Sequence, residues 1–417
     1  MFHGGSAFDW DAAKSEWGGA RPLGRRKASG GHQGFTQLTR SDPDTIAVQA
    51  MSVRRDRAGR QLWYLALELP TEGHAAHTHI TGIVSGLSAR GWRVTLWHPP
   101  SRKRRGPARR LLDSVSTQAR LIRRRDRPDV LYVRGHFASL PTVIWAKLRR
   151  VPLVIEVNGP ATDVLSSWPG ARPIVPLIRA SSDLQLRLST MAIAVTAELC
   201  QSARAAGAKR CHVVSNGADV DLFAPSAATS YVLPSAFVSF TGTLATWQGI
   251  NSLLEAMDSP AWPPGVSLVV IGDGALTDLV RAKASVDARL TYLGRLPPRD
   301  VGGIVAKSLC AIAPKSARFH ARTGVVPLKL FEAMACGVPV IVSDLPGQAG
   351  IVSRYGCGFV IPPDDAGAIA DAVATVVNDL ELARAMGERG RAAAVAEFSW
   401  DAAADRTHDV LVGLARN

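Results

Sequence analysis

Two ionisable side chains, Lys329 and Glu332, stand one helical turn apart and carry the clearest indication of chemistry in the sequence. The spacing of apolar residues predicts a helix from near Leu328 to Gly337, followed by a strand. The free amides and partial positive charge of a helix N-terminus suit a phosphate, and Lys329 adds a full charge. Glu332 can reach the same ligand, and a carboxylate accepts hydrogen bonds from two vicinal ribose hydroxyls. An ordinary Lys–Glu helical pair, worth ~0.3 kcal/mol, has the same spacing, so both interpretations stay open at this point.

Other candidate side chains follow predicted strands. Asp273 and Gly274 lie in a Gly-Asp-Gly turn that opens a helix, which fits either an anion-binding loop or a tight structural turn. Arg134 and His136 come directly after an apolar run, and His77 begins the first helix. In parallel sheets ligands lie at the carboxyl ends of the strands, so these groups are candidate contacts to an acceptor or a phosphate. A lone histidine is also commonly structural.

Strands and helices alternate along the chain in two successive series. The first series has apolar strand runs at 62–67, 94–97, 129–133, 152–157, 191–195 and 211–214, and predicted helices at 77–90, 140–150 and 197–206, the last capped by Thr196. The second series has strands at 237–240, 267–271, 290–292, 309–313, 339–342 and 359–361, and helices at 250–257, 276–284, 299–307, 328–335, 366–377 and 401–414. Short apolar runs of this kind are typical of buried parallel strands.

This alternation predicts an α/β protein with two Rossmann-like doubly wound domains that face each other across a cleft. Residues 1–60 lack a sustained period and are rich in Gly, Ser, Arg and Asp, so a disordered basic tail is expected there. The N-terminal domain is assigned to residues 61–225 and the C-terminal domain to 226–417. Asp219 and Asp221 are expected to cap and brace the hinge between the two domains.

The amino-acid composition indicates the cellular compartment in which the protein is expected. Hydrophobic residues make up 47% of the 417 residues and charged residues 20%, as in a folded globular protein. No apolar stretch is long enough for a transmembrane helix, and the N-terminus lacks the layout of a signal peptide. Five scattered cysteines without a CxxC pair argue against a zinc site or a disulfide framework. A cytoplasmic protein is therefore expected.

The net charge of +14 is concentrated in the first half of the chain. Residues 1–225 contain 33 Lys/Arg and 17 Asp/Glu, against 16 and 18 in residues 226–417. The excess lies in the clusters 54–57, 102–105, 109–110 and 123–125. Such a field attracts anionic membrane surfaces or nucleic acid, or it is a solvated arginine-rich face; of the two polyanions the membrane is favoured.

Several ordered motifs together resemble the retaining glycosyltransferases of family 4, which have the GT-B fold. The segment 327–341, Pro-Leu-Lys-Leu-Phe-Glu-Ala-Met-Ala-Cys-Gly-Val-Pro-Val-Ile, resembles the donor-binding signature of that family. The glycine loop at 69–77, the end of a middle strand at 154–160, the interdomain segment 213–225, the loop at 241–250 and Phe398-Ser399-Trp400 match the family in the same order. The resemblance covers residues 62–415, nearly all of the chain apart from the tail.

The resemblance implies transfer of a sugar from a nucleotide-diphosphate donor, UDP or GDP, with retention and without a metal or other cofactor. The acceptor would be a glycan or a lipid-linked molecule. Catalytic roles are implied for Lys329, Glu332 and His136. The residues implied in donor binding are Gly242, Thr243, Gln248, Gly249, Asp273, Gly274, Arg322, Gly324, Val326 and Leu328. The acceptor or phosphate loop would comprise Gly73, His77, Arg134 and Asn158.

The sequence departs from the family pattern at several of these positions. Thr243 and Gln248 are neutral where many members have a basic pair, Gly324 stands where many have a glutamate, and Asn158 replaces a frequent histidine. Without this basic pair, two positive charges that would stabilise the leaving diphosphate are missing. Lys329 could compensate for them, with Arg318 or Arg322 as helpers. A catalytically inactive homologue that binds a nucleotide sugar or a partner is therefore the alternative. An NAD-type oxidoreductase is disfavoured because the first loop lacks GxGxxG.

Overall fold

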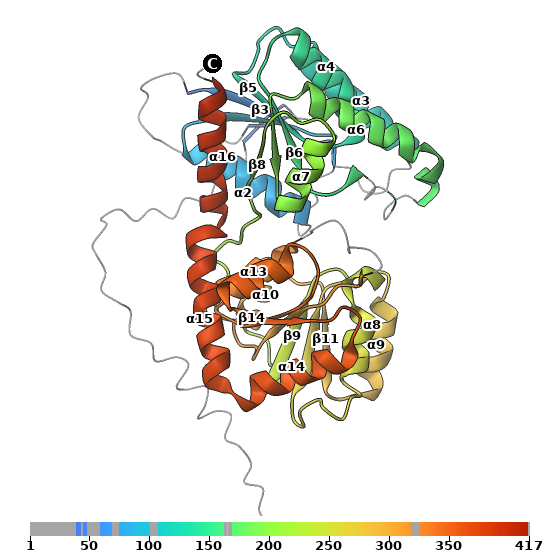
Figure 1. Cartoon of the computed structure of the whole chain (residues 1–417), viewed down its shortest axis with the longest axis vertical. Coiled ribbons are helices and arrows are strands. Elements are labelled where there is room, and N and C mark those ends of the chain that lie inside the picture. The colour runs from blue at the N-terminus through green and yellow to red at the C-terminus, as the bar shows by residue number, and fades with distance from the viewer. Residues whose placement is uncertain are drawn as a thin grey trace, which may run out of the picture.

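The computed structural model describes residues 39–42, 45–47, 59–68, 75–100, 107–161, 165, 169–317 and 326–415. Two α/β domains lie one above the other along the long axis of the molecule, and each has a mainly parallel sheet with helices on both faces (Figure 1). The predicted fold class is confirmed. No described helix is long and apolar enough to cross a bilayer.

The N-terminal sheet has the strand order β1-β2-β4-β3-β5-β6-β7-β8. The predicted apolar runs form its parallel part: β3 (Gln61–Leu65), β4 (Arg93–Trp97), β5 (Val130–Arg134), β6 (Leu153–Val157), β7 (Met191–Ala194) and β8 (Cys211–Val213). Successive side chains of a strand point to opposite faces. Trp63 and Leu65 therefore pack in one core, while Leu62 and Tyr64 pack in another on the opposite face of the sheet.

The helices that cover this sheet were predicted only in part. Three correspond to predicted helices: α2 (Ala75–Ala89), α4 (Leu140–Leu148) and α7 (Ala197–Ala205), with the Thr196 hydroxyl accepting a hydrogen bond from the Leu199 amide as the N-cap. Helices α3 (Pro107–Ile122) and α6 (Val175–Leu188) were not predicted. Within the expected tail, β1 (Thr39–Asp42) and β2 (Thr45–Ala47) form a hairpin that extends the sheet beside β4. Strands of four and three residues are too short to show a period in the sequence.

The C-terminal sheet is entirely parallel, in the order β11-β10-β9-β12-β13-β14. Its strands are β9 (Phe237–Thr241), β10 (Ser267–Ile271), β11 (Leu290–Gly294), β12 (Ala311–Ala313), β13 (Val340–Ser343) and β14 (Gly358–Ile361). The helices between them are α8 (Ile250–Ala256), α9 (Thr277–Val286), α10 (Pro298–Val305), α12 (Leu328–Ala335), α13 (Gln348–Tyr355) and α14 (Ala366–Asn378). Each predicted strand of this series is present within a few residues.

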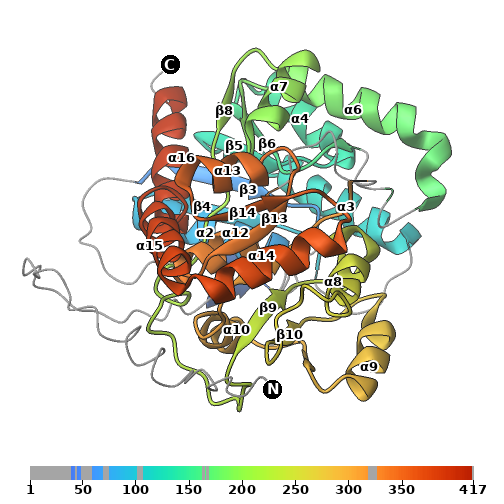
Figure 2. The same cartoon turned by 60° about the horizontal axis from the view of Figure 1, so that its bottom comes forward.

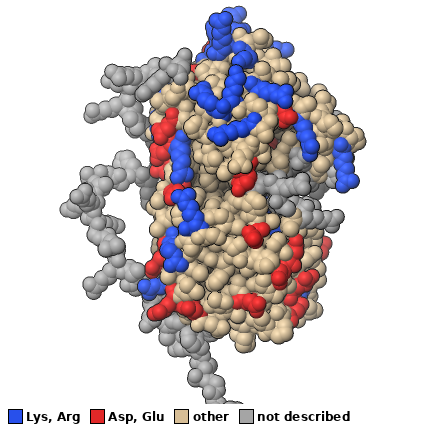
Figure 3. All heavy atoms as spheres, viewed as in Figure 1, with Lys and Arg blue, Asp and Glu red and all other residues tan. Residues whose placement is uncertain are grey.

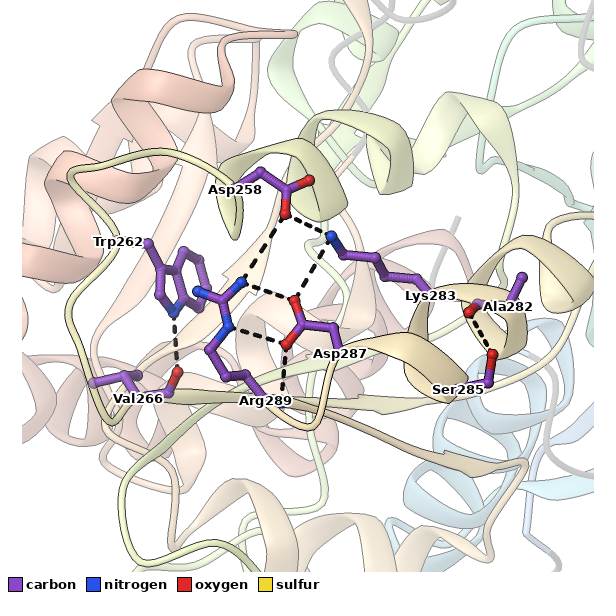
Figure 4. Close-up of polar contacts among 8 residues, drawn as sticks. All are labelled: Asp258, Trp262, Val266, Ala282, Lys283, Ser285, Asp287 and Arg289. Carbon is purple, nitrogen blue, oxygen red and sulfur yellow. Dashed lines mark hydrogen bonds and ion pairs between the residues drawn. The ribbon is translucent and has the colours of Figure 1, made fainter.

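Charges on the outer side of the C-terminal domain are closely paired (Figure 4). Lys283 on α9 lies 2.6 Å from Asp258, which follows α8, and the Arg289 guanidinium lies 2.8 Å from the Asp287 carboxylate. The hydrogen bond from Arg289 lowers the pKa of Asp287 to about 2. This cluster joins the end of α8 to α9 and to the start of β11.

The chain returns to the first domain through α15 (Leu380–Glu397) and α16 (Trp400–Ala415), which run along one side of the molecule (Figure 1). Helix α16 packs against α2, where a Cβ atom on Gly82 or Gly86 would lie within 2.5 Å of Trp400 or Ala404. The absence of side chains at these two positions lets the helices approach closely. The expectation that the C-terminal helix packs back onto the first domain is confirmed.

The linker between the domains is held at the bend between α15 and α16. The Ala218 amide donates to the Phe398 carbonyl at 2.8 Å, and the Trp400 amide donates to the Ala218 carbonyl at 3.1 Å. The Asp219 carboxylate accepts hydrogen bonds from the amides of Asp221 and Leu222, which is the bracing role predicted for Asp219.

Candidate functional site

Helix α12 places Lys329 and Glu332 beside the ends of the central strands of the C-terminal sheet. It begins after Pro327, whose extended backbone ends the preceding segment. The Lys329 Nζ atom lies 3.8 Å from the centre of the Phe240 ring, at the end of β9. It also lies 3.7 Å from the point that a Cβ atom on Gly242 would occupy, so the bare backbone at that position leaves room beside the ammonium group.

The Lys329 ammonium group is enclosed by protein and has no hydrogen-bond partner among the described residues. Burial, and secondly the charge of Lys315, lower the pKa of Lys329 well below its ordinary value, while Glu332 acts in the opposite direction. An enclosed cation without a partner is costly, and the cost falls if an anion binds beside it. The site therefore favours an anionic ligand.

Glu332 lines the same small pocket as Lys329, together with Ser239, Thr241 and Ala313. Burial raises the pKa of Glu332 to about 7, against the opposing charge of Lys329. The protonated form of this carboxyl group is thus favoured more than in an ordinary glutamate. Hydrogen-bond donors that approach it would stabilise the ionised form.

The loop after β9 contains four of the predicted donor contacts. Gly242 and Gly249 both have positive φ angles, +124° and +67°. Thr243 is exposed, whereas Gln248 is buried and its side-chain oxygen has no partner among the described residues. Neither side chain supplies a positive charge, so the cations of this site come from other elements.

Lys315 supplies such a charge and was missed by the sequence analysis. It stands two residues after β12 and is 3% exposed, and its Nζ atom lies 5.1 Å from the centre of the Trp247 ring. It is close enough to Lys329 to lower the pKa of that side chain. Its place just after an apolar strand, the criterion used for Arg134 and His136, was the signal that could have found it.

The glycine turn after β10 has the structural role that the sequence left open. A Cβ atom on Gly272 would lie 1.8 Å from the Gly242 carbonyl oxygen, and one on Gly274 would lie 2.5 Å from that of Leu244. The Gly272 and Gly274 amides are hydrogen-bonded to the Gly294 carbonyl and the Thr277 hydroxyl. These amides are therefore hydrogen-bonded to β11 and to α9, and a contact of Gly274 with a donor stays a prediction. Asp273 is exposed near Arg295, and its contact with a donor stays a prediction.

Several predicted site residues are placed less completely. Val326 is buried in the core beside α12, and Leu328 is partly exposed at the first position of that helix. Gly73, Arg318, Arg322 and Gly324 lie outside the described residues.

In the N-terminal domain Arg134 and Asn158 belong to a buried network centred on Glu156. Arg134 Nη1 donates to the Glu156 carboxylate at 2.8 Å, and its Nε donates to Glu68 at 3.2 Å. Asn158 also donates to Glu156, as does the Tyr64 hydroxyl at 3.0 Å. Two carboxylates thus neutralise Arg134, which differs from the free anion contact that its position had suggested. Contacts of Arg134 and Asn158 with an acceptor stay predictions.

His79 completes this network, although the sequence analysis considered His77 and His136 instead. Its Nε2 atom lies 2.8 Å from the Glu156 carboxylate, and its Nδ1 atom lies 2.8 Å from Asn216 Oδ1 in the interdomain linker. Burial by itself would raise the pKa of Glu156, but His79 and Arg134 outweigh it and hold this pKa well below its usual range. His77 lies partly exposed in the first turn of α2.

His136 has a local structural contact. Its Nδ1 atom accepts a hydrogen bond from the Ala138 amide and caps the short helix η1 (Phe137–Ser139). Burial lowers the pKa of His136, so its ring is neutral near neutral pH. A catalytic role for this side chain stays a prediction.

Within the described residues no group of His, Cys, Asp and Glu is arranged to hold a metal ion. The five cysteines are buried and free. Among the described residues, Lys315, Lys329 and Glu332 are the charged side chains placed in or beside the pocket at α12.

Two family models match the chain, one over each domain. Residues 58–222 match Glycosyltransferase Family 4, and residues 232–393 match Glycosyl transferases group 1. The boundary between the two matches falls in the linker, next to the predicted boundary at 225.

Curated relatives match at moderate identity. The GDP-mannose-dependent monoacylated alpha-(1-6)-phosphatidylinositol monomannoside mannosyltransferase of Corynebacterium glutamicum is 27% identical over 208 residues, which cover 47% of this chain and 54% of that protein. The glycogen synthase of Mycobacterium tuberculosis is 23% identical over 297 residues, 70% of each chain. The match to the first of these relatives thus spans about half of its length.

Solved structures share the fold over most of the chain. Sucrose-phosphate synthase from Thermosynechococcus elongatus has a TM-score of 0.69 at 17% identity, covering 85% of this chain and 99% of that one. Anabaena Alr3699/HepE in complex with UDP has a TM-score of 0.63 at 18% identity, covering 85% and 100%. The chain is therefore a GT-B protein built of a family 4-like glycosyltransferase domain followed by a glycosyl transferases group 1 domain.

Proposed function

We propose that this protein transfers a sugar from a nucleotide-diphosphate donor to an acceptor in the synthesis of a glycan, polysaccharide or glycolipid. One observation carries the proposal: the enclosed Lys329 ammonium group, which has no hydrogen-bond partner among the described residues, stands in the first turn of α12 with Glu332 one turn further on. The two family models over the domains and the GT-B fold support the same reaction class.

The leaving diphosphate would bind beside Lys329. As the glycosidic bond breaks, negative charge grows on the diphosphate, and positive groups fixed in place stabilise it without reorganisation. Lys329 would supply one charge and Lys315 a second, in place of the basic pair that Thr243 and Gln248 lack. With two lysines in these positions, we propose that the reaction proceeds without a metal ion or another cofactor.

Glu332 would hold the ribose of the donor. Its carboxylate can accept two hydrogen bonds from vicinal hydroxyls. These bonds would favour the ionised form of Glu332 over the protonated form. Retention at the anomeric carbon is part of the proposal and rests on the family resemblance. UDP and GDP are the proposed donor nucleotides, because Anabaena Alr3699/HepE is in complex with UDP and the Corynebacterium relative is GDP-mannose-dependent. The protein would act in the cytoplasm, at an anionic membrane surface if the acceptor is lipid-linked.

The alternative is a homologue that binds a nucleotide sugar without transferring it. The neutral Thr243 and Gln248 favour this alternative, because fewer cations face the leaving group than in many relatives. Hydrolysis or transfer of the sugar that depends on Lys329 would exclude it.

The first test is thermal stability in the presence of UDP-, GDP-, ADP- and TDP-sugars. A ligand at a hundredfold excess over its Kd stabilises the native state by ~2.7 kcal/mol. We expect a shift with one nucleotide class, lost in Glu332→Ala and Lys329→Met and kept in Lys307→Met, which removes an exposed lysine of the same domain. A wild-type protein that responds to no donor would contradict the proposed site.

A further inference from the structure

Helix α3 exposes large apolar side chains and buries polar ones. Leu111, Leu112 and Val115 on this helix are 55%, 61% and 54% exposed. Thr117, Gln118 and Leu121 of the same helix are buried. A surface helix of a globular domain ordinarily turns its apolar stripe toward the core, whereas α3 leaves three large apolar side chains exposed.

The inward polar residues of α3 are held by specific hydrogen bonds, which fix the rotation of the helix. The Gln118 amide nitrogen donates to the Ala138 carbonyl at 2.9 Å, and its side-chain oxygen accepts from the Thr142 hydroxyl at 2.9 Å. Leu121, fully buried, anchors the end of the helix in the core. Turning α3 to bury its leucines would break these bonds and leave buried polar groups unsatisfied.

The neighbouring helices extend the apolar surface. Helix α3 contacts α4, and α4 contacts α6, so the three form one layer over the sheet (Figures 1 and 2). Among the described residues, eight of the thirteen large exposed apolar side chains lie on these helices and the short segment before α6. They are Leu111, Leu112, Val115, Ile144, Leu148, Ile174, Leu177 and Leu184. We call this the α3–α4–α6 face.

Basic residues surround these apolar side chains. Figure 3 shows Lys and Arg gathered over the N-terminal domain, with few Asp or Glu among them on the side drawn. The exposed basic residues of the layer include Arg109, Arg110, Arg123, Lys147, Arg149, Arg150 and Arg179. Within the described part of the chain, no carboxylate forms an ion pair with Arg109, Arg110 or Arg123. Arg124 is the exception in this segment, because it pairs with Asp126 at 2.8 Å.

We propose that the α3–α4–α6 face docks on an anionic lipid surface, with Leu111, Leu112 and Val115 entering the interface between headgroups and acyl chains. Helices that lie in this interface combine an apolar strip with flanking Lys and Arg. Nucleic acid would contact the arginines through its phosphates but would leave the leucines exposed to water. The face and the donor pocket share no residue, so docking does not depend on the proposed transfer reaction.

Flotation with vesicles tests this proposal. The full-length protein is mixed with vesicles of phosphatidylglycerol and phosphatidylcholine, or of phosphatidylcholine alone. We expect binding only to the anionic vesicles, weakened at high salt because screening reduces the attraction. The variant L111Q/L112Q/V115Q keeps every charge and should bind at least about tenfold more weakly. The control L279Q/V286Q removes two exposed apolar residues of α9 and should bind like wild type.

A polarity-sensitive dye reports whether the leucines enter the bilayer. The five native cysteines are buried, so a dye attached through Leu112→Cys labels that position selectively. Its emission should shift to the blue with anionic vesicles, while the dye at Leu279→Cys should not shift. The thermal response to nucleotide sugars is measured on the same variants, and an unchanged response shows that they remain folded and separates docking from donor binding.

Three outcomes would overturn the proposal. Wild-type protein that floats with neither vesicle type has no lipid-docking face. Undiminished vesicle binding by L111Q/L112Q/V115Q would mean that the protein adsorbs to anionic vesicles through its basic residues alone. Concentration-dependent self-association that this triple substitution abolishes, in the absence of vesicle binding, would assign the face to contact between copies of the chain.

Discussion

Each domain has a carboxylate shielded from solvent, the buried Glu156 on β6 and the partly exposed Glu332 on α12, and the groups around them differ. Glu156 is matched by Arg134 and His79, and these partners keep it ionised despite its burial. Glu332 is drawn toward its protonated form by burial, and the ammonium group of Lys329 beside it has no hydrogen-bond partner among the described residues.

The difference separates a cluster whose charges are compensated within the protein from one whose charges are not. A buried network whose members satisfy one another stabilises one arrangement of the backbone. A buried cation that lacks a partner costs stability until an anion arrives. The balanced cluster in the first domain ties α2, β5 and β6 to the linker residue Asn216, whereas the unbalanced cluster in the second domain is the proposed binding site.

The largest effect expected is on the stability of the balanced cluster. Glu156→Gln would leave the charge of Arg134 buried without its main partner, and breaking a buried pair in this way costs about 3–5 kcal/mol in the free energy of unfolding. Urea denaturation measures the loss. Glu68→Gln is the matched control, because Glu68 is half-exposed and its removal should cost no more than about 1 kcal/mol. Equal losses in the two variants would show that Glu156 does not organise the cluster.

The unbalanced cluster should respond in the opposite way. Lys329→Met removes a desolvated cation, so the free energy of unfolding of the ligand-free protein should stay equal or rise. Transfer or hydrolysis of the donor sugar should fall by about 10²–10³, as when one group that stabilises developing charge is removed. Urea denaturation and kcat/KM are measured together, with Lys307→Met as the control. If Lys329→Met lowered the free energy of unfolding but kept its activity, Lys329 would have the structural role that the comparison assigns to the Glu156 cluster.

The pH dependence of stability sharpens the comparison further. The carboxyl group of Glu332 has a pKa of about 7 in the folded protein against an ordinary value of 4.5. Between these values the folded state binds more protons than the unfolded state, so this group's contribution to stability is complete below about pH 4.5 and is lost as the pH rises through 7. The loss amounts to at most about 3 kcal/mol.

Glu332→Gln should remove this slope. The free energy of unfolding of wild type and variant, measured from pH 5 to 8, should converge or cross as the wild type loses stability. Parallel curves would mean that Glu332 is not held in its protonated form by the fold.

How far the sequence predicts these features depends on which contacts are local. The parallel strands of both sheets were predicted because their apolar runs are continuous, and α12 was predicted because its apolar spacing and its end at Gly337 are local signals. Helix α3 was missed. Its apolar residues have helical spacing, but such a period does not show which side faces the core, and Leu111, Leu112 and Val115 are exposed.

The site residues also divide into those predicted from local signals and those whose contacts join distant segments of the chain. Lys329 and Glu332 were predicted together because one helix carries both. The partnership of Arg134 with Glu156 was not predicted, since it depends on the pairing of β5 with β6. Lys315 follows an apolar strand, which is a local signal, but its proximity to Lys329 depends on the order of strands in the sheet, which a single sequence does not reveal.

Lys315 therefore gives the most discriminating test, although the smallest effect. Lys315→Met removes the neighbouring charge that lowers the pKa of Lys329, so that pKa should rise while one of two cations facing the diphosphate is lost. If the second effect dominates, donor affinity falls by about tenfold, equivalent to about 1.4 kcal/mol, the scale of a charge-assisted contact. Titration with the nucleotide diphosphate at pH 6 and pH 9 distinguishes the two, because relief of the lysine pKa would strengthen binding selectively at high pH. Affinity that rises at both pH values would mean that Lys315 opposes the ligand, and the second cation would then have to be sought on another element.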